Sequence, residues 1–102
     1  MVEYSEDGKE LIYAYGITGH FIIPKSVTKI TCSFSDCPSM ISIKIPDSVK
    51  EIGDFSYTNL TSINISNSVT KIEAGAFMGC TKLTSITIPE SVNSIEEGAF
   101  YL

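Results

Sequence analysis

A short pattern recurs four times along this chain, and repetition at this interval is typical of only a few architectures. Each copy begins with an isoleucine and ends with a valine four residues later. The leading isoleucines are separated by 22, 20 and 23 residues, and the copies span residues 23–27, 45–49, 65–69 and 88–92. Four copies in register predict a solenoid, in which similar turns stack and each turn contacts only its neighbours.

Each turn is constant in length in one part and variable in the rest. Seven residues separate each leading isoleucine from a second isoleucine, and five separate a Leu or Met from the next leading isoleucine. The remaining arcs, 30–40, 52–60 and 72–83, run for ten, eight and eleven residues. Strands held in register cannot change length without turning their side chains to the other face. The constant part therefore predicts strands, and the variable arc predicts loops.

The constant part opens with the pattern L-x-x-L-x-L, which is the strand pattern of leucine-rich repeats. Over residues 83–88 this alternation directs Ile86 and Ile88 inward, and Pro89 ends the strand because it has no N–H to donate. A second short strand is expected where Val92 and Ile95 bring the chain back inward. The variable arcs carry four phenylalanines that we expect in the core, namely Phe34, Phe55, Phe77 and Phe100.

The repeated unit resembles the BspA-like leucine-rich repeats, whose units read roughly L-T-S-I-T-I-P-x-S-V-T-x-I-x-x-x-A-F-x-x-C. Residues 65–87 match almost throughout, and the resemblance covers about residues 16–102. It implies a right-handed leucine-rich-repeat solenoid of the α/β repeat class, mostly β. Short parallel strands would lie on the concave face, and loops or short helical turns on the convex face. We expect a hairpin or cap over residues 1–16, turned at Asp7-Gly8, and about four repeats over 17–102, the last incomplete.

Composition restricts the partners. The chain holds 7 Lys and Arg against 12 Asp and Glu, a net charge of −5, so no basic surface predicts nucleic-acid binding. Its apolar runs are short, which predicts no membrane insertion. The acidic start, residues 1–7, lacks the basic and apolar segments of a signal peptide. Localisation is thus unknown from the residues, although the resemblance implies a cell-surface or extracellular protein of anaerobic bacteria or protists.

The residues that carry chemistry are few. Cys37 and Cys80 share a position two turns apart, which places their Cα atoms roughly 10 Å from each other, too far for a disulfide. We expect both to be buried free thiols and Cys32 to be a partly exposed thiol on a convex loop. One histidine and three scattered cysteines have no metal-ligand spacing. The recurring serines at 26, 48, 68 and 91 have no base beside them, so they favour turn capping over catalysis. We predict no enzyme, no metal and no cofactor.

The outward strand positions form the candidate concave binding face. They are small and mostly polar, with no aromatic side chain: His20, Ile22, Ser42, Lys44, Ser62, Asn64, Ser85 and Thr87. A solvated sheet face and a shallow contact surface used in many copies are both compatible with this pattern. Two glycosylation sequons, at Asn59 and Asn64, are relevant only if a eukaryote exports the chain.

These observations favour a non-catalytic binding module. The resemblance implies adhesion, with a matrix or cell-surface protein as partner. The alternative is an intracellular structural or scaffold fragment without a ligand of its own, which the free thiols and the missing export signal favour. Solenoid ends need polar caps. The apolar residues beside the open last turn therefore predict either a piece of a longer array or end-to-end self-association; they are Ile86, Ile88, Val92, Ile95 and Phe100.

Overall fold

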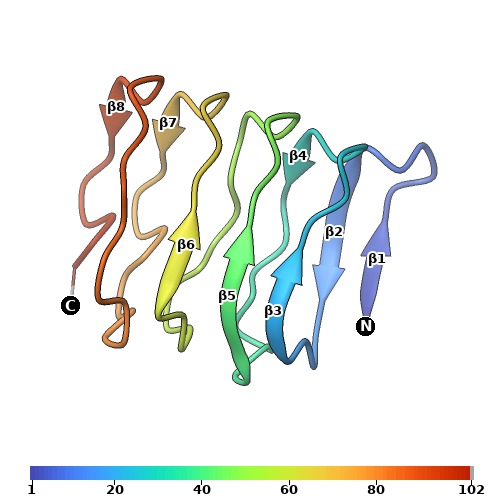
Figure 1. The fold of residues 1–102 in the computed structure, drawn as a ribbon, viewed down its shortest axis with the longest axis horizontal. Helices are drawn as coiled ribbons and strands as arrows, with labels where there is room; N and C mark the ends of the chain where they lie inside the picture. Colours follow the sequence, from blue (N-terminus) through green and yellow to red (C-terminus); the bar gives the residue numbers. More distant parts are fainter. Residues whose placement is uncertain (102) are drawn as a thin grey trace.

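The computed structural model describes residues 1–101 and contains strands and turns. Its elements are β1 (Val2–Tyr4), β2 (Glu10–Ala14), β3 (Gly19–Ile22), β4 (Lys29–Ile30), β5 (Met40–Lys44), β6 (Ser62–Asn64), β7 (Lys71–Ile72) and β8 (Ser94–Ile95). Successive turns of chain stack side by side from the N-terminus to the C-terminal end (Figure 1). The stacking of similar turns predicted from the period is confirmed.

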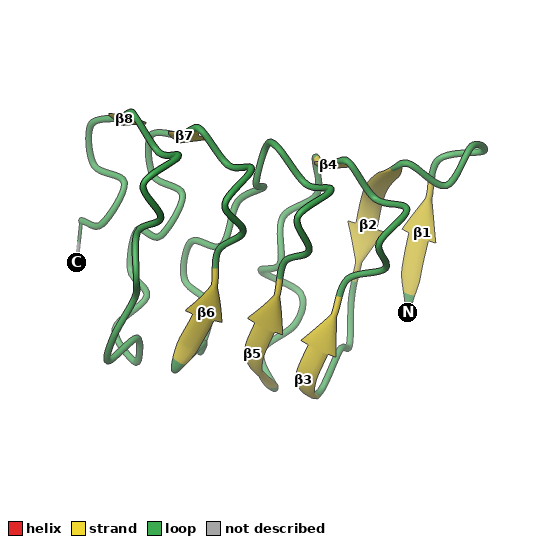
Figure 2. Ribbon diagram, turned by 45° about the horizontal axis from the view of Figure 1, so that its top comes forward, coloured by secondary structure: helices red, strands yellow, loops and turns green. Residues whose placement is uncertain are grey.

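Parallel ladders in three sheets connect the turns. β3, β5 and β6 form one set, and the other set consists of two separate sheets, in which β2 pairs with β4 and β7 with β8. The pairing is equivalent from turn to turn, since Phe21 pairs with Ile43 and Ile43 with Ile63. The two sets of strands lie along different edges of the molecule, and loops join them (Figure 2). The predicted second short strand is therefore present at β7 and β8.

The N-terminal hairpin has the tight turn that Asp7-Gly8 predicted. Gly8 adopts a φ of 74°, and its N–H donates to the Ser5 carbonyl at 2.9 Å. The Asp7 carboxylate accepts from Ser5 Oγ at 2.7 Å and from the Lys9 N–H at 3.0 Å. These hydrogen bonds stabilise the ionised form and lower the pKa of Asp7. Because β2 also pairs with β4, the hairpin continues into the second set of strands.

A stack of phenylalanine rings forms the centre of the core. The ring centroids of Phe34, Phe55, Phe77 and Phe100 follow one another at 4.8, 5.5 and 5.2 Å, with interplanar angles of 2°, 5° and 8°. The first three side chains are at most 1% exposed. Buried aliphatic columns, including Ile43 and Ile63, flank the stack. The variable arcs thus place a ring at the same position in each turn, as predicted.

The three cysteines are free and buried. The prediction that Cys32 is partly exposed is wrong, because its side chain is only 5% exposed. Residues 30–34 alternate between buried and exposed positions, which directs Cys32 into the core. This burial raises the pKa of the Cys32 thiol to about 11. Thr58 occupies the turn between Cys37 and Cys80, and its Oγ1 lies 3.5 Å from Cys80 Sγ.

Two expectations need correction. Residues 1–101 contain no helix, and therefore none that could cross a bilayer, so the short helical turns are replaced by tight turns. The arcs are too short to nucleate a helix. Gly75, Gly79 and Gly98 adopt φ values near 70°, which turns the backbone out of a right-handed helical path. Residues 83–88 form no strand, although the Thr84 N–H donates to the Thr61 carbonyl at 3.3 Å. Ile95 pairs in register with the buried Ile72, which places it on the inward side as predicted, and it is 52% exposed because β8 has a described neighbour on one side only. Leu102 lies outside the described residues.

Candidate functional site

The strand ladder places six of the eight expected face residues together. His20 pairs with Ser42 and Ser42 with Ser62, while Ile22 pairs with Lys44 and Lys44 with Asn64. We call these six residues the sheet face. They form two parallel columns, because side chains at alternate positions of paired strands point to the same side. Ser85 and Thr87 are exposed in the next turn, outside any strand.

The alternation that directs the sheet-face side chains outward also directs the side chains between them into the core. Ile43 and Ile63 are 2% and 8% exposed, whereas Ile22, in the neighbouring strand position, is 69% exposed. Ile41 at the start of β5 is 45% exposed as well. Sequence reasoning overlooked Ile41, although its position between Met40 and Ser42 in the L-x-x pattern could have identified it. The surface thus combines apolar and small polar side chains.

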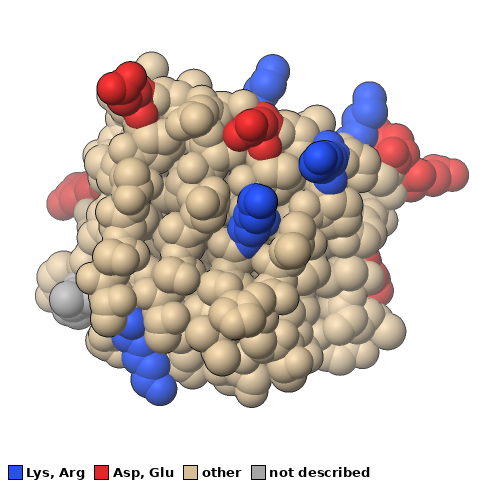
Figure 3. Space-filling view, viewed as in Figure 1, with Lys and Arg blue, Asp and Glu red and all other residues tan. Residues whose placement is uncertain are grey.

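A shallow hollow of about 290 Å³ lies over the three strands, and the sheet-face residues line it. The imidazole Nδ1 of His20 is hydrogen-bonded to Ser42 Oγ. Figure 3, which views the β3-β5-β6 side, shows charged side chains along its upper part and at its lower left. Uncharged side chains cover most of the rest. Such a surface can form hydrogen bonds and van der Waals contacts with a partner.

The same geometry gives little support for catalysis. A Ser–His pair acts as a nucleophile when a third group orients the base, and in residues 1–101 the ring of His20 has no carboxylate partner. Within this part of the chain, no three His, Cys, Asp or Glu side chains gather as metal ligands. One of the recurring serines bonds to the backbone: Ser91 Oγ donates to the Val69 carbonyl of the preceding turn at 2.7 Å, whereas the buried Ser48 Oγ has no partner among residues 1–101.

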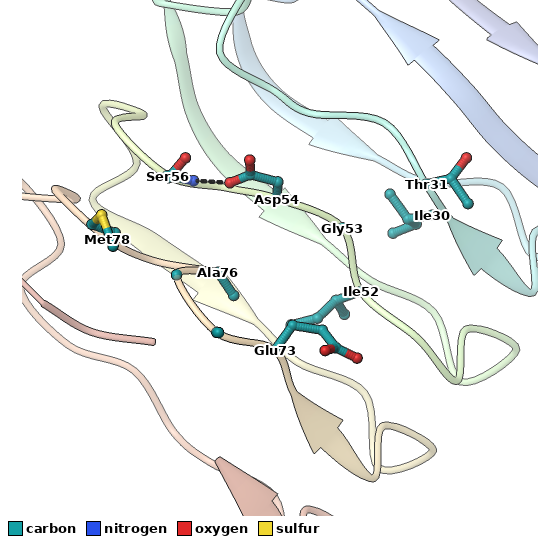
Figure 4. Close-up of a pocket in the computed structure, with 11 residues that line it drawn as sticks. Ile30, Thr31, Ile52, Gly53, Asp54, Ser56, Glu73, Ala76 and Met78 are labelled. Carbon is teal, nitrogen blue, oxygen red and sulfur yellow. Dashed lines mark hydrogen bonds between the residues drawn. The ribbon is translucent and has the colours of Figure 1, made fainter. Parts of the chain in front are cut away.

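A second, larger hollow lies on the arcs that follow β4 and β7. Its volume is about 500 Å³, and it shares no residue with the sheet face. Figure 4 shows Ile52 and Gly53 between the side chains of Ile30 and Glu73. Sequence reasoning noted the short second arc without recognising this hollow. The signal was available, since only two residues lie between Ile52 and Phe55, whereas four lie between Ile72 and Phe77.

Comparison with known proteins assigns the repeat. A family model described as "BspA type Leucine rich repeat region (6 copies)" matches residues 10–102. A solved leucine rich cell surface protein from Faecalibacterium prausnitzii A2-165 is 33% identical with a TM-score of 0.82, and the match covers 98% of this chain but 28% of that one. A leucine-rich repeat protein from Eubacterium ventriosum ATCC 27560 is 20% identical over 98% of this chain and 47% of its own, with a TM-score of 0.40. No curated protein matches.

Proposed function

Since this chain belongs to the BspA-type leucine-rich repeat family, we propose that it is a non-catalytic binding module that recognises a protein partner through its sheet face. The observation that carries this proposal is the register of β3, β5 and β6. It arranges equivalent side chains in continuous columns with exposed Ile22 and Ile41 beside them. Apolar side chains surrounded by hydrogen-bonding groups are the usual composition of a protein contact surface.

A cell-surface or extracellular role in adhesion extends this proposal. The F. prausnitzii relative is a cell surface protein, and this chain spans 28% of its length. Contacts through small side chains such as Ser42 and Ser62 are individually weak, because binding hot spots are usually Trp, Tyr or Arg. Many copies on one surface would raise the overall strength by avidity. Ser85 and Thr87 would extend the same contact surface into the next turn.

A bead-adhesion assay tests both parts. Beads that carry many copies of the chain, and single soluble copies, are applied to surfaces coated with extracellular-matrix protein. We expect the beads to be retained and single copies to wash off. Ile22→Ser combined with Lys44→Ser should abolish retention, whereas Thr70→Ala, an exposed position outside the face, should not. Equal retention of both variants would disprove the sheet-face assignment, and no retention of any bead would favour the intracellular scaffold.

Self-association at the last described turn is a second proposal, carried by a separate observation. Leu83, Ile86 and Phe100 line a hollow of about 360 Å³, and the buried Phe77 and Cys80 lie at its floor. In the same turn, Ile95 is half exposed on β8, whose outer edge has no strand partner among residues 1–101. A second copy could cover both the apolar side chains and the edge. Light scattering at high concentration should show association that Ile95→Lys abolishes, and a strictly monomeric wild type would refute it.

A further inference from the structure

The hollow beside Gly53 follows from the short second arc. This arc has only Gly53 and Asp54 between Ile52 and Phe55, whereas the third arc has four residues at the same place. Ile52 and Phe55 still occupy their columns, so the chain between them takes the shorter path against the first turn. A Cβ added to Gly53 would lie 2.5 Å from the Cys32 carbonyl oxygen and 2.9 Å from Ile30 Cγ2. The third arc, 73–76, therefore has an arc of equal length, 96–99, on one side only, and the hollow separates it from the shorter second arc on the other side.

The lining of this hollow is apolar with carboxylates at its borders. Figure 4 shows the Glu73 carboxylate beside Ile52, and the Asp54 carboxylate beside Ser56. Asp54 Oδ1 accepts the Ser56 N–H at 2.8 Å. In residues 1–101, no lysine or other cation lies within 4 Å of the Asp54 carboxylate. We call the hollow, with Thr31, Gly53, Asp54, Glu73, Ala74 and Gly75, the acidic notch.

The charges around the acidic notch are mostly negative. Thr31 Oγ1, on the first-turn side, donates to Glu10 Oε2 at 2.8 Å, which adds a third carboxylate near the border. Lys71 is a nearby cation, and its Nζ lies 2.9 Å from Glu96 and 4.0 Å from Glu73. Glu96 therefore competes with Glu73 for Lys71, and Lys29, which precedes Ile30, pairs with Glu51 at 3.8 Å. The chain as a whole carries a net charge of −5, which also favours a cationic partner.

We propose that the acidic notch binds an arginine side chain of a partner protein. An arginine has an aliphatic stem that can lie along the apolar floor while its charged end stays at the border near water. Its guanidinium presents five donors to carboxylates and is more weakly hydrated than an ammonium group. The hollow has the volume of a small ligand pocket, which is ample for one such side chain. This contact is separate from the sheet face and goes beyond the proposed function.

The test uses a capped Gly-Gly-Arg-Gly-Gly peptide and the same peptide with citrulline, which keeps the shape of arginine but has no charge. Two-dimensional NMR of the ¹⁵N-labelled chain follows the backbone amides of Gly53 and Gly75. We expect both to shift in a saturable way at millimolar arginine peptide. The shifts should weaken as salt increases and be absent with the citrulline peptide.

Two variants locate the effect. Asp54→Asn combined with Glu73→Gln removes the charges but keeps an acceptor for the Ser56 N–H, and should weaken binding about fivefold or more. Ala74→Leu fills the hollow from an exposed position and should abolish binding. Glu90→Gln, an exposed carboxylate elsewhere, should bind as the wild type does. Unchanged amide positions in the wild type, equal shifts with citrulline, or undiminished binding by both notch variants would overturn the proposal.

Discussion

Replacing Phe77 tests how much the ring stack contributes to folding. Phe77 is 1% exposed and lies between Phe55 at 5.5 Å and Phe100 at 5.2 Å. Phe77→Ala should cost about 3–5 kcal/mol, the usual cost of truncating a buried phenylalanine. Phe77→Leu retains most of the apolar volume but loses two ring contacts. At about 0.5–1.5 kcal/mol for each contact, the expected cost of this second change is about 1–3 kcal/mol.

These costs are large for a chain of this size. At about 0.05–0.15 kcal/mol per residue, its stability should be roughly 5–15 kcal/mol, so Phe77→Ala should remove a large fraction of it. Urea unfolding followed by circular dichroism measures each change, and Thr87→Ala serves as the exposed control, with a cost below about 0.5 kcal/mol. If Phe77→Leu were as mild as Thr87→Ala, stacking would contribute nothing. If Phe77→Ala were equally mild, the inward assignment would be wrong.

The remaining predictions concern buried polar groups and the hairpin. Thiol titration should find three free thiols after denaturation and no rapidly reacting thiol in the native state, since burial raises the pKa of Cys32. Thr58→Val should lower stability by about 1 kcal/mol in thermal melts, because it removes a buried hydroxyl that donates to a carbonyl at 2.9 Å; Thr58→Cys should cost less. Ser48→Ala should stabilise the chain by up to about 1 kcal/mol, because its buried Oγ has no partner among residues 1–101, and a loss in urea melts would contradict this. The lowered pKa of Asp7 means that its contribution is present above the ordinary value of 3.8 and is lost as pH falls through the folded-state value. NMR shifts of the hairpin should follow this loss in the wild type and not in Asp7→Asn.

The repeat pattern could be read from the sequence because it depends on spacing alone. Constant intervals located the strands, and the recurring phenylalanines located the core, since a solenoid must place equivalent residues at equivalent depths. The columns of His20, Ser42 and Ser62 followed from the same argument, and the pairing of β3, β5 and β6 brings them together. Whether this surface binds a partner depends on chemistry outside the chain, so spacing cannot decide it.

The features that the sequence did not predict depend on how the backbone runs within each turn, which the repeat spacing does not determine. Cys32 was assigned to a loop surface, but two-residue alternation continues past Ile30 and buries it. To predict the acidic notch, one would have to know which neighbouring turn the shortened arc packs against. The close approach of Gly53 to the Cys32 carbonyl shows that it is the first turn. Residues 83–88 have the strand pattern, but their backbone bond to the preceding turn is the single one from the Thr84 N–H to the Thr61 carbonyl, so the pattern alone overestimated their pairing.

The constant register between turns has a genetic consequence. Ser42 and Ser62 occupy equivalent backbone positions, as do Ile43 and Ile63. A deletion that joined residue 42 directly to residue 63 would therefore excise one whole turn and leave Ile63 in the position that Ile43 held. A recombination event between repeated stretches of the gene produces this kind of junction. Arrays of this kind can consequently lose or gain turns without redesigning their core, and the length of such a protein can evolve independently of the surface that any one turn presents.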